Sequence, residues 1–373
     1  MKVKLFHGEK MTKISWCRNP KTGLEGKSWN PIVGCSKVSE GCKNCYALNA
    51  ANRMSKNPNR KVHDVYHDIV NDKKQWSGKL KFLSDRLFDP LKWKKPRFVF
   101  VNSMSDLFHE DIDFEVIDKI YAVMSLCPNH IFQILTKRPD IAFEYYKSRM
   151  NENSDYWKNM AIDMIKNFNG FLDSTGMLDS KLLKMGWHRT FEDQDHGFNV
   201  GLPLKNIWLG ISVEDQKSCD ERIPFLSNIN VEKTFVSAEP LLSYVDFKFS
   251  SVIGNSVVDW MIVGGESGKN ARPMHPDWVA DVIRQCKSVN VPVFFKQWGA
   301  YEPYDFSRNE VNFDNDFMVD GYGKTYPVDK RLDCNAALMQ KKVGMHVNQN
   351  YKGSALQEFP KVYFTIYDDS FSF

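Results

Sequence analysis

The feature that most constrains the fold is a series of six apolar segments, each ending in polar side chains. These segments are residues 97–106, 130–139, 206–215, 233–242, 259–268 and 291–299. Near-continuous apolar runs of this length are typical of strands buried on both faces of a parallel sheet. Helical patterns separate several of them, notably at 114–126 and 278–287. This alternation predicts an α/β fold with a parallel sheet, open or barrel-like.

The carboxyl ends of these six segments carry a recurring polar set. In parallel barrels the active site lies at the carboxyl ends of the strands. The residues at these ends are Ser103, Ser105, Asp106, Thr136, Lys137, Arg138, Ser212, Glu214, Asp215, Ser237, Glu239, Glu266, Ser267, Lys296 and Gln297. Charge recurs at nearly every end, which favours a functional site over the alternative that loops simply begin there. The catalytic candidates are Asp106, Lys137, Glu214, Glu239, Glu266 and Lys296.

Three closely spaced cysteines form the most specific motif. Residues 29–47 read WNPIVGCSKVSEGCKNCYA and place Cys35, Cys42 and Cys45 at C-x6-C-x2-C spacing. Eight cysteines in 373 residues are too few for a disulfide scaffold, so a tight cluster indicates metal binding or catalysis. Thiolates ligate iron–sulfur clusters and structural zinc, and unmetallated thiols are the remaining alternative.

Three local ligands leave the fourth position of a metal site open. A zinc ion would take a remote fourth ligand, for which the candidates are Cys17, His63, His67 and His109. A [4Fe–4S] cluster would instead keep one iron free to bind a substrate or cofactor.

The remaining sequence indicates the domain organisation and the cellular setting. Residues 1–299 form the expected barrel, interrupted at 140–205 by a polar and aromatic insertion, and residues 300–373 are expected to be an irregular extension. No run of about 18 apolar residues is present, so no membrane span is expected. The start of the chain lacks an apolar signal core, which favours a cytoplasmic location.

A basic segment raises the question of nucleic-acid binding. Residues 56–97 contain twelve Lys or Arg against five Asp or Glu, although the whole chain carries only +4. The aromatic side chains of Trp76, Phe82, Phe88 and Trp93 are interleaved with these cations. Cations for phosphates and aromatic rings for bases are what a nucleic-acid groove needs. The alternative is a solvated basic face whose aromatic residues anchor it to the core.

The motifs, taken in order from residue 29 to residue 299, resemble a known family. W-N-P-x-x-G-C-x6-C-x2-C-Y-A is followed by NSMSDLFHE, LTKRP, SVED, SAEPLL, DWMIVGGESG-x3-RPM and FFKQWG. This series is similar to uncharacterised phage and prophage proteins noted for their three-cysteine motif. It also resembles the radical S-adenosylmethionine (SAM) superfamily, in particular the branch containing spore photoproduct lyase.

The resemblance implies a partial (β/α)6 TIM-like barrel that holds a [4Fe–4S] cluster and SAM. Cys35, Cys42 and Cys45 would bind the cluster, and the open iron would chelate the amino and carboxylate groups of SAM. One electron then cleaves SAM, and the resulting radical abstracts a substrate hydrogen. The first cysteine gap is three residues longer than in the commonest spacing of the superfamily, C-x3-C-x2-C.

The resemblance also implies cofactor contacts at other positions. Tyr46 would lie beside the cluster, and the strand end with Asn102, Ser103, Ser105 and Asp106 would bind the SAM amino group. Ser212, Glu214 and Glu239 are candidates for the ribose or adenine. Gly264 and Gly265, with Glu266, are interpreted as a close approach of backbone to ligand at the barrel opening.

Three functional hypotheses follow. The first is a radical SAM iron–sulfur enzyme that repairs or modifies a nucleic acid or nucleotide by hydrogen abstraction. The second is a zinc- or cluster-stabilised nucleic-acid-binding or adaptor protein of a phage or phage-defence system, and the resemblance permits a partner protein encoded alongside. The third is a metal-independent barrel hydrolase that uses Asp106, Glu214 and Glu239.

Overall fold

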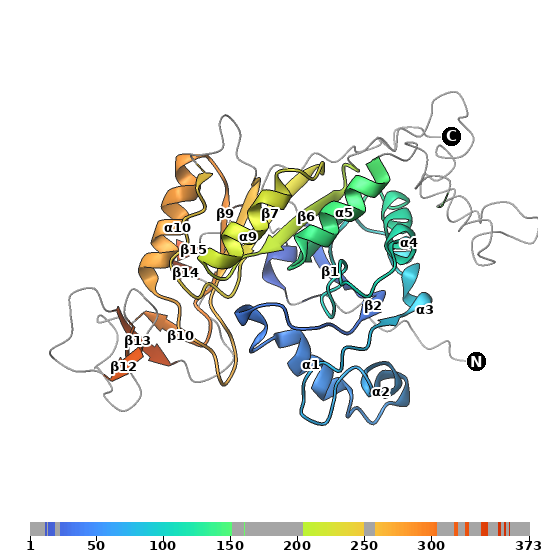
Figure 1. The fold of residues 1–373 in the computed structure, drawn as a ribbon, viewed down its shortest axis with the longest axis horizontal. Helices are drawn as coiled ribbons and strands as arrows, with labels where there is room; N and C mark the ends of the chain where they lie inside the picture. The colour runs from blue at the N-terminus through green and yellow to red at the C-terminus, as the bar shows by residue number, and fades with distance from the viewer. Residues whose placement is uncertain are drawn as a thin grey trace, which may run out of the picture.

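A curled sheet of seven parallel strands forms a half barrel at the centre of the molecule (Figure 1). The strands are β1 (Glu25–Trp29), β4 (Arg97–Val101), β5 (Ile131–Thr136), β6 (Ile207–Ser212), β7 (Lys233–Ala238), β8 (Trp260–Gly264) and β9 (Val293–Gln297). Their order in the sheet is the order along the chain, and every neighbouring pair is parallel. The predicted parallel sheet is therefore confirmed, within a mixed α/β architecture.

The computed structural model describes the half barrel and parts of the segments around it. The described residues are 12, 14–18, 23–150, 160, 204–249, 258–303, 317–319, 325–327, 337–341, 350–351, 354–355 and 358. Most of the predicted insertion at 140–205 lies outside them, but its beginning belongs to helix α5 (Pro139–Met150), which follows β5.

The sheet has one strand more than the six that the sequence predicts. The additional strand is β1, whose sequence EGKSW contains no apolar run. It forms because it pairs in register with β4 along its whole length, from Glu25 opposite Arg97 to Trp29 opposite Val101. Local sequence gives little signal for such a strand, since the pairing partner supplies the hydrogen bonds and the burial.

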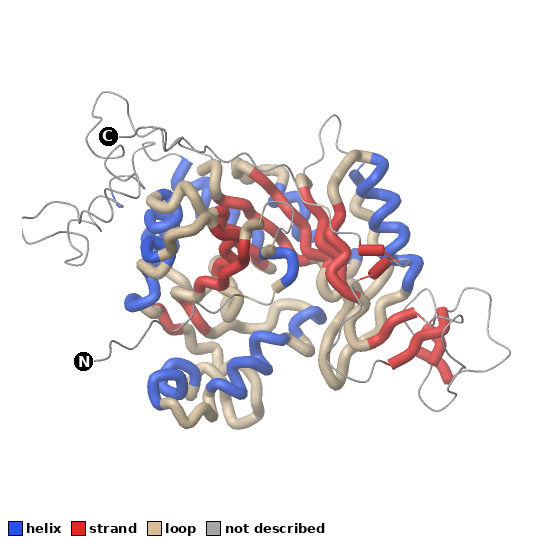
Figure 2. Tube along the Cα trace, turned by 180° about the vertical axis from the view of Figure 1, so that it is seen from behind, coloured by secondary structure: helices blue, strands red, loops and turns tan. Residues whose placement is uncertain are grey.

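Helices cover the outer face of the sheet (Figures 1 and 2). They are α4 (Phe114–Ser125), α5, α9 (Gln216–Leu226) and α10 (Pro276–Ser288). The two helices that the sequence predicts are confirmed as α4 and α10. The apolar side chains between these helices and the sheet form the largest core cluster, which contains Val99, Val101, Ile134, Leu209, Val236, Met261 and Phe295.

The alternate strand positions point to the inner face. There aromatic side chains fill the half of the barrel at the starts of the strands, here called the lower half. This second core cluster, here called the plug, is centred on Trp16, Phe98, Trp208, Phe235, Trp260 and Phe294. Trp16 comes from the short helix η1 (Ser15–Cys17) and meets the ring of Phe100 edge-to-face at 4.8 Å. Edge-to-face contacts of this kind add to the free energy gained by burial.

The chain between the end of β1 and the start of β4 forms a small layer of short elements. It comprises β2 (Ile32–Val33), η2 (Glu40–Cys42), α1 (Tyr46–Met54), α2 (Arg60–Tyr66), β3 (Lys81–Phe82), α3 (Ser84–Leu87) and η3 (Pro90–Lys92). β2 and β3 pair antiparallel, and α1 packs on α2 over a third apolar cluster that includes Ala47, Leu48, Ala51 and Tyr66. Figure 1 shows α1 and α2 at the edge of the half barrel where its strands end, and Figure 2 shows the same arrangement from behind.

The described residues of the C-terminal extension include short antiparallel strands. β10 (Tyr301–Pro303), β13 (Ala337–Lys341), β11 (Phe317–Val319) and β12 (Thr325–Pro327) form one sheet in that order, and β14 (Asn350–Tyr351) pairs with β15 (Ser354–Ala355). Farther along, the backbone of Glu358 returns to the half barrel. Its N–H donates to the Val293 carbonyl at 3.0 Å, and its carbonyl accepts from the Trp260 indole at 2.8 Å.

Among the residues described, no helix is both long enough and apolar enough to cross a bilayer.

Candidate functional site

The loop with the three cysteines (residues 29–47, the cysteine loop) leaves the sheet at the end of β1 and is held by a hydrogen bond and a tight turn. The side-chain oxygen of Asn30 accepts from the hydroxyl of Ser103 at 3.1 Å. Gly34 has a φ of +101°, and a Cβ at this position would lie 2.2 Å from the Lys79 carbonyl oxygen. Cys35 therefore follows a turn that requires glycine.

The three thiols are half-buried and differ in their electrostatic surroundings. Burial, reinforced by the charge of Asp106, raises the pKa of the Cys35 thiol to about 12. Burial also raises the pKa of Cys45, against the effect of backbone N–H groups at the start of α1. Burial alone would raise the pKa of Cys42, but the charge of Lys137 and nearby N–H groups lower it overall. Cys42 is thus the thiol most disposed to ionise before any metal binds.

Glu214 follows β6 and is completely buried between two cations. Its Oε1 contacts Nζ of Lys137, and its Oε2 accepts from Arg222 at 2.9 Å. The cysteine loop rests on this group, because the hydroxyl of Ser39 donates to Oε1 at 2.9 Å. A Cβ at Gly41 would lie 2.4 Å from the Glu214 side chain, so glycine permits the contact.

Asp106 holds the turn after β5 and links it to the cysteine loop. It accepts from the hydroxyl of Thr136 at 2.7 Å and from the backbone N–H of Lys137 at 2.9 Å. Arg138 donates to Asp106 at 3.2 Å and to the hydroxyl of Ser36 at 2.6 Å. These hydrogen bonds give Asp106 a positioning role, since its oxygens are engaged by the protein.

A second ion pair, between Glu266 and Arg272, clamps the other side of the loop. Arg272 donates to Glu266 Oε1 at 2.8 Å and to the carbonyl of Glu40 at 2.9 Å. Asn44 donates to Glu266 Oε2 at 2.9 Å. Burial alone would raise the pKa of Glu266, but the hydrogen bonds from Arg272 and Asn44 lower it. The carboxylate is therefore the form that holds the loop.

A third ion pair lies deeper, above the plug. Lys296 contacts Glu239 at 2.8 Å, at the ends of β9 and β7. A Cβ at Gly264 would lie 2.6 Å from Glu239, and one at Gly265 would lie 2.0 Å from the Trp298 carbonyl oxygen. The close approach predicted at these two glycines is thus an approach to the protein itself.

Asn102, at the end of β4, is a buried polar residue whose side chain has no hydrogen-bond partner among the described residues. The residue is 3% exposed and has a φ of +57°. Neither Nδ2 nor Oδ1 makes a hydrogen bond to any described residue. A buried amide without partners is costly, so this donor and acceptor are suited to a ligand. By contrast Tyr46 is 58% exposed, and its hydroxyl donates to the Ser103 carbonyl at 3.0 Å.

The structure brings most of the predicted site residues to one edge, here called the mouth. Lys137, Ser212, Glu214, Glu239, Glu266 and Lys296 line it, above the plug. Ser103 and Ser105 make hydrogen bonds to the cysteine loop. Ser103 donates to Asn30, and Ser105 donates to the Ile32 carbonyl at 3.1 Å. Ser212 contributes its carbonyl, which accepts from Arg222 at 2.7 Å.

Sequence reasoning missed the residues that hold the cysteine loop against the mouth. They are Ser36, Ser39, Glu40, Asn44, Arg222 and Arg272. Arg272 lies within the quoted motif GGESG-x3-RPM but received no role. Arg222 lies on α9, eight residues after Glu214. Neither the strand nor the helix period predicts that these two side chains meet.

None of the candidate fourth ligands joins the three thiols in a close group within the described chain. Cys17 is buried in the plug, and His109 contacts the hydroxyl of Ser36 through Nε2 at 2.9 Å. His63 lies on α2, His67 directly follows the helix, and both form a separate group with Asp64.

The basic segment is divided between two parts of the molecule. Phe88 and Trp93 pack against the main core and Trp76 packs against the α1–α2 cluster, as expected for aromatic anchors. Phe82 is 38% exposed on β3, which pairs with the strand that leads into the cysteine loop. Lys73 and Lys74 are exposed in the turn before β3.

A hollow of about 610 Å³ lies beside the cysteine loop. Val38 of the loop lines it together with Lys137, Arg138, Arg222 and Phe225. It opens next to the ion pair of Glu214 and therefore adjoins the mouth.

One family model matches residues 11–360, and its description is "Protein of unknown function (DUF5131)". No match was found among curated proteins or among solved structures.

Proposed function

We propose, for a chain that belongs to the family described as "Protein of unknown function (DUF5131)", that it is an iron–sulfur enzyme of the radical SAM type. Cys35, Cys42 and Cys45 would hold a [4Fe–4S] cluster at the mouth of the half barrel. The half barrel would correspond to the partial (β/α)6 barrel of that superfamily, with the added strand β1 leading directly into the cysteine loop.

The observation that carries the proposal is the position of the three cysteines. Cys35, Cys42 and Cys45 all lie in the loop that follows β1, at the edge of the half barrel where its strands end. Thiolates are the ligands of iron–sulfur clusters. Three of them in one loop would bind three irons of a [4Fe–4S] cluster and leave the fourth iron open.

The charges around the loop support the same assignment. Three thiolates concentrate negative charge, and Lys137 and Arg222 lie beneath the loop while Arg138 and Arg272 hold its two sides. Burial lowers the pKa of Lys137, while the charge of Cys42 opposes that effect. Lys137 and Cys42 therefore stabilise each other's charged forms.

When bound, the cluster and SAM supply electron transfer and hydrogen-atom abstraction, which no side chain provides. The chain would bind and orient the cofactor. Asn102 has a free donor and a free acceptor for the amino-acid end of SAM. Glu239 and Lys296 lie deeper in the half barrel and would bind polar groups of the cofactor or substrate. The plug below closes the half barrel to water from the opposite side.

For the substrate we propose a nucleic acid or nucleotide. The support is the exposed Phe82 next to β2, with Lys73, Lys74 and Lys79 on the adjoining turn. An exposed ring can stack on a base while lysines neutralise phosphates. Binding should then weaken steeply between about 50 and 200 mM salt, and Phe82→Ala should weaken it further. Salt-insensitive binding, or none, would favour a small-molecule substrate.

The second candidate is a nucleic-acid-binding or adaptor protein stabilised by zinc or by a cluster. The same basic surface favours it, because that surface needs no chemistry at the mouth. It differs from the first candidate in the metal content of the chain and in SAM cleavage.

The deciding experiment is iron, sulfide and zinc analysis of the full chain purified without oxygen, with a visible spectrum. We expect about four irons and four sulfides per chain in the wild type. Cys42→Ser should lose them, and Cys219→Ala, at a buried cysteine outside the loop, should keep them. Loaded protein should then cleave SAM.

Three outcomes would overturn the proposal. One zinc per chain without sulfide would leave a structural site. Retention of full iron in Cys42→Ser would refute the ligand assignment. Loss of the cluster in Cys17→Ala would identify a fourth protein ligand and remove the open iron on which SAM binding depends.

A further inference from the structure

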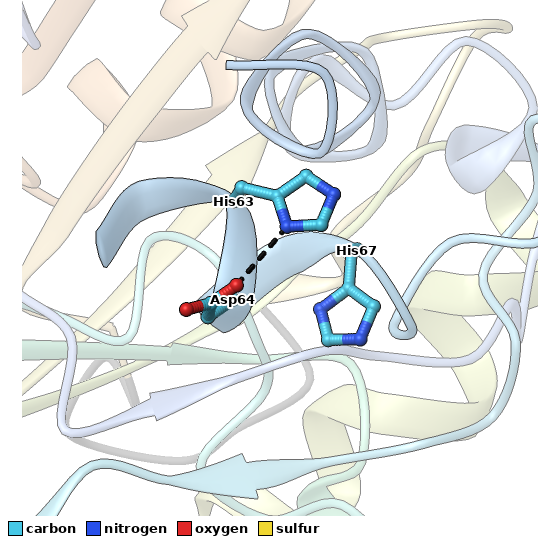
Figure 3. Close-up of side chains that lie close together, drawn as sticks. All are labelled: His63, Asp64 and His67. Atoms are coloured by element: carbon cyan, nitrogen blue, oxygen red, sulfur yellow. Dashed lines mark hydrogen bonds and ion pairs between the residues drawn. The ribbon is translucent and has the colours of Figure 1, made fainter. Parts of the chain in front are cut away.

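We propose that helix α2 carries a second metal site, which takes one divalent ion of the late first-row transition metals. The ligands are His63, Asp64 and His67 (Figure 3). The site lies apart from the cysteine loop and does not depend on the function proposed for that loop.

The helix brings the two imidazoles to the same face. His63 and His67 are four residues apart, the spacing at which helical side chains meet. Their rings are stacked, with centroids 4.9 Å apart and planes at 10°. Because an imidazole nitrogen binds a metal in the plane of its ring, the rings would turn about their side-chain bonds to share one ion. Nδ1 of His63 lies 3.1 Å from Asp64 Oδ1, and one ligand atom from each of the three residues lies within 4.8 Å of the other two. Two imidazoles at this spacing are a recurring zinc-binding arrangement on helices.

The packing of α2 leaves this face open. Val62, Val65 and Tyr66 turn toward α1 and the apolar cluster between the helices. The side chains of His63 and His67 are 43% and 46% exposed, and that of Asp64 is 63% exposed. An ion can therefore reach all three groups and retain water in its remaining positions.

The charges nearby leave Asp64 available to a cation. Lys81 pairs with Asp68, at 2.5 Å, and donates to the backbone carbonyl of Asp64 at 2.7 Å. Lys81 therefore neutralises the carboxylate of Asp68 and does not pair with the carboxylate of Asp64. Asp68 also lies 4.0 Å from Nδ1 of His67, outside hydrogen-bond distance.

The ligand set indicates the class of metal. Imidazole suits zinc, copper and nickel, whereas magnesium and calcium prefer sites made entirely of oxygen. Two imidazoles and one carboxylate thus favour Zn²⁺, Ni²⁺ or Cu²⁺ over the alkaline-earth ions.

The test is calorimetric titration of the full chain with NiSO₄ and, separately, with MgSO₄. We expect one Ni²⁺ per chain and no comparable binding of Mg²⁺. His63→Gln with His67→Gln should lower Ni²⁺ affinity by at least about tenfold, and Asp64→Asn by about threefold. Lys61→Gln, an exposed substitution on the same helix, should change nothing. Unaltered thermal unfolding would show that the variants fold, as expected for exposed side chains.

The cysteine variants separate this site from the first one. Ni²⁺ binding that persists in a Cys35→Ser, Cys42→Ser, Cys45→Ser chain supports the proposal. Binding that disappears there, or that is unchanged in the double histidine variant, overturns it. Absence of Ni²⁺ binding to the wild type also overturns it and leaves the iron and sulfide result unaffected.

Discussion

The plug and the mouth are built from the same face of the same strands, yet they have opposite compositions. On β6 the inward positions run from Trp208 through Gly210 and Ser212 to Glu214, which follows the strand. The lower half is filled with aromatic rings. The upper half carries ion pairs at the ends of the strands, among them those of Glu214, Glu266 and Glu239, and the first two hold the cysteine loop. The difference teaches that stability and chemistry are separated along the strand direction, as in complete parallel barrels.

The largest expected effect is on the plug. Trp260→Ala removes a fully buried ring at its centre and should lower the free energy of unfolding by about 3–5 kcal/mol. Urea unfolding measures the loss, and the iron content of the folded fraction should stay unchanged. A variant of normal stability that lacks iron would show that the plug and the mouth are not separate.

Glu214→Gln should come next, because it breaks a buried ionic group at the mouth. Lys137 and Arg222 would keep their charges without the carboxylate, at a cost of about 3 kcal/mol. The matched control is Glu221→Gln on α9, the helix that carries Arg222, because the exposed pair of Glu221 with Lys217 contributes less than about 1 kcal/mol. Equal effects of the two substitutions on thermal unfolding would contradict the burial argument.

Protonation of His130, at the edge of the sheet where the strands begin, should make the stability of the fold depend on pH. Burial lowers the pKa of His130, at the start of β5, to about 4, whereas an unfolded histidine titrates near 6.5. Between these values the unfolded chain binds more protons, so stability falls by up to about 3 kcal/mol as pH drops from about 6.5 to 4. His130→Gln should flatten this dependence in urea unfolding, and the exposed His63→Gln should leave it in place.

The smallest expected effect concerns the contact between the loop and Glu214. Gly41→Ala places a methyl group against that side chain and should cost about 1–3 kcal/mol, with reduced metal loading. In a Glu214→Ala background the added methyl group has space, so the cost of Gly41→Ala should shrink. Strictly additive effects would exclude direct contact between the two residues.

These two regions also differ in how far the sequence predicts them. The apolar segments contain their own signal, since β-branched and aromatic runs favour buried strands wherever they occur. The strand-end position of Glu214 and Glu239 follows from the same runs. β1 could not be predicted, because the polar sequence EGKSW becomes a strand only beside β4.

The partners at the mouth could not be predicted for a related reason. The contact of Arg222 with Glu214 depends on how α9 packs, and that of Arg272 with Glu40 joins residues more than 200 positions apart. The basic segment shows that composition alone does not predict burial. Its composition is uniform, but the fold buries Phe88 in the core and leaves Phe82 exposed.

The order of the strands bears on how the protein is made. Because each strand pairs with the one synthesised just before it, the half barrel can add one edge at a time as the chain leaves the ribosome. The return of Glu358 is the exception. Trp260 and Val293 meet their partner only after about 65 to 100 further residues have been synthesised, so this contact forms later than the strand pairs do.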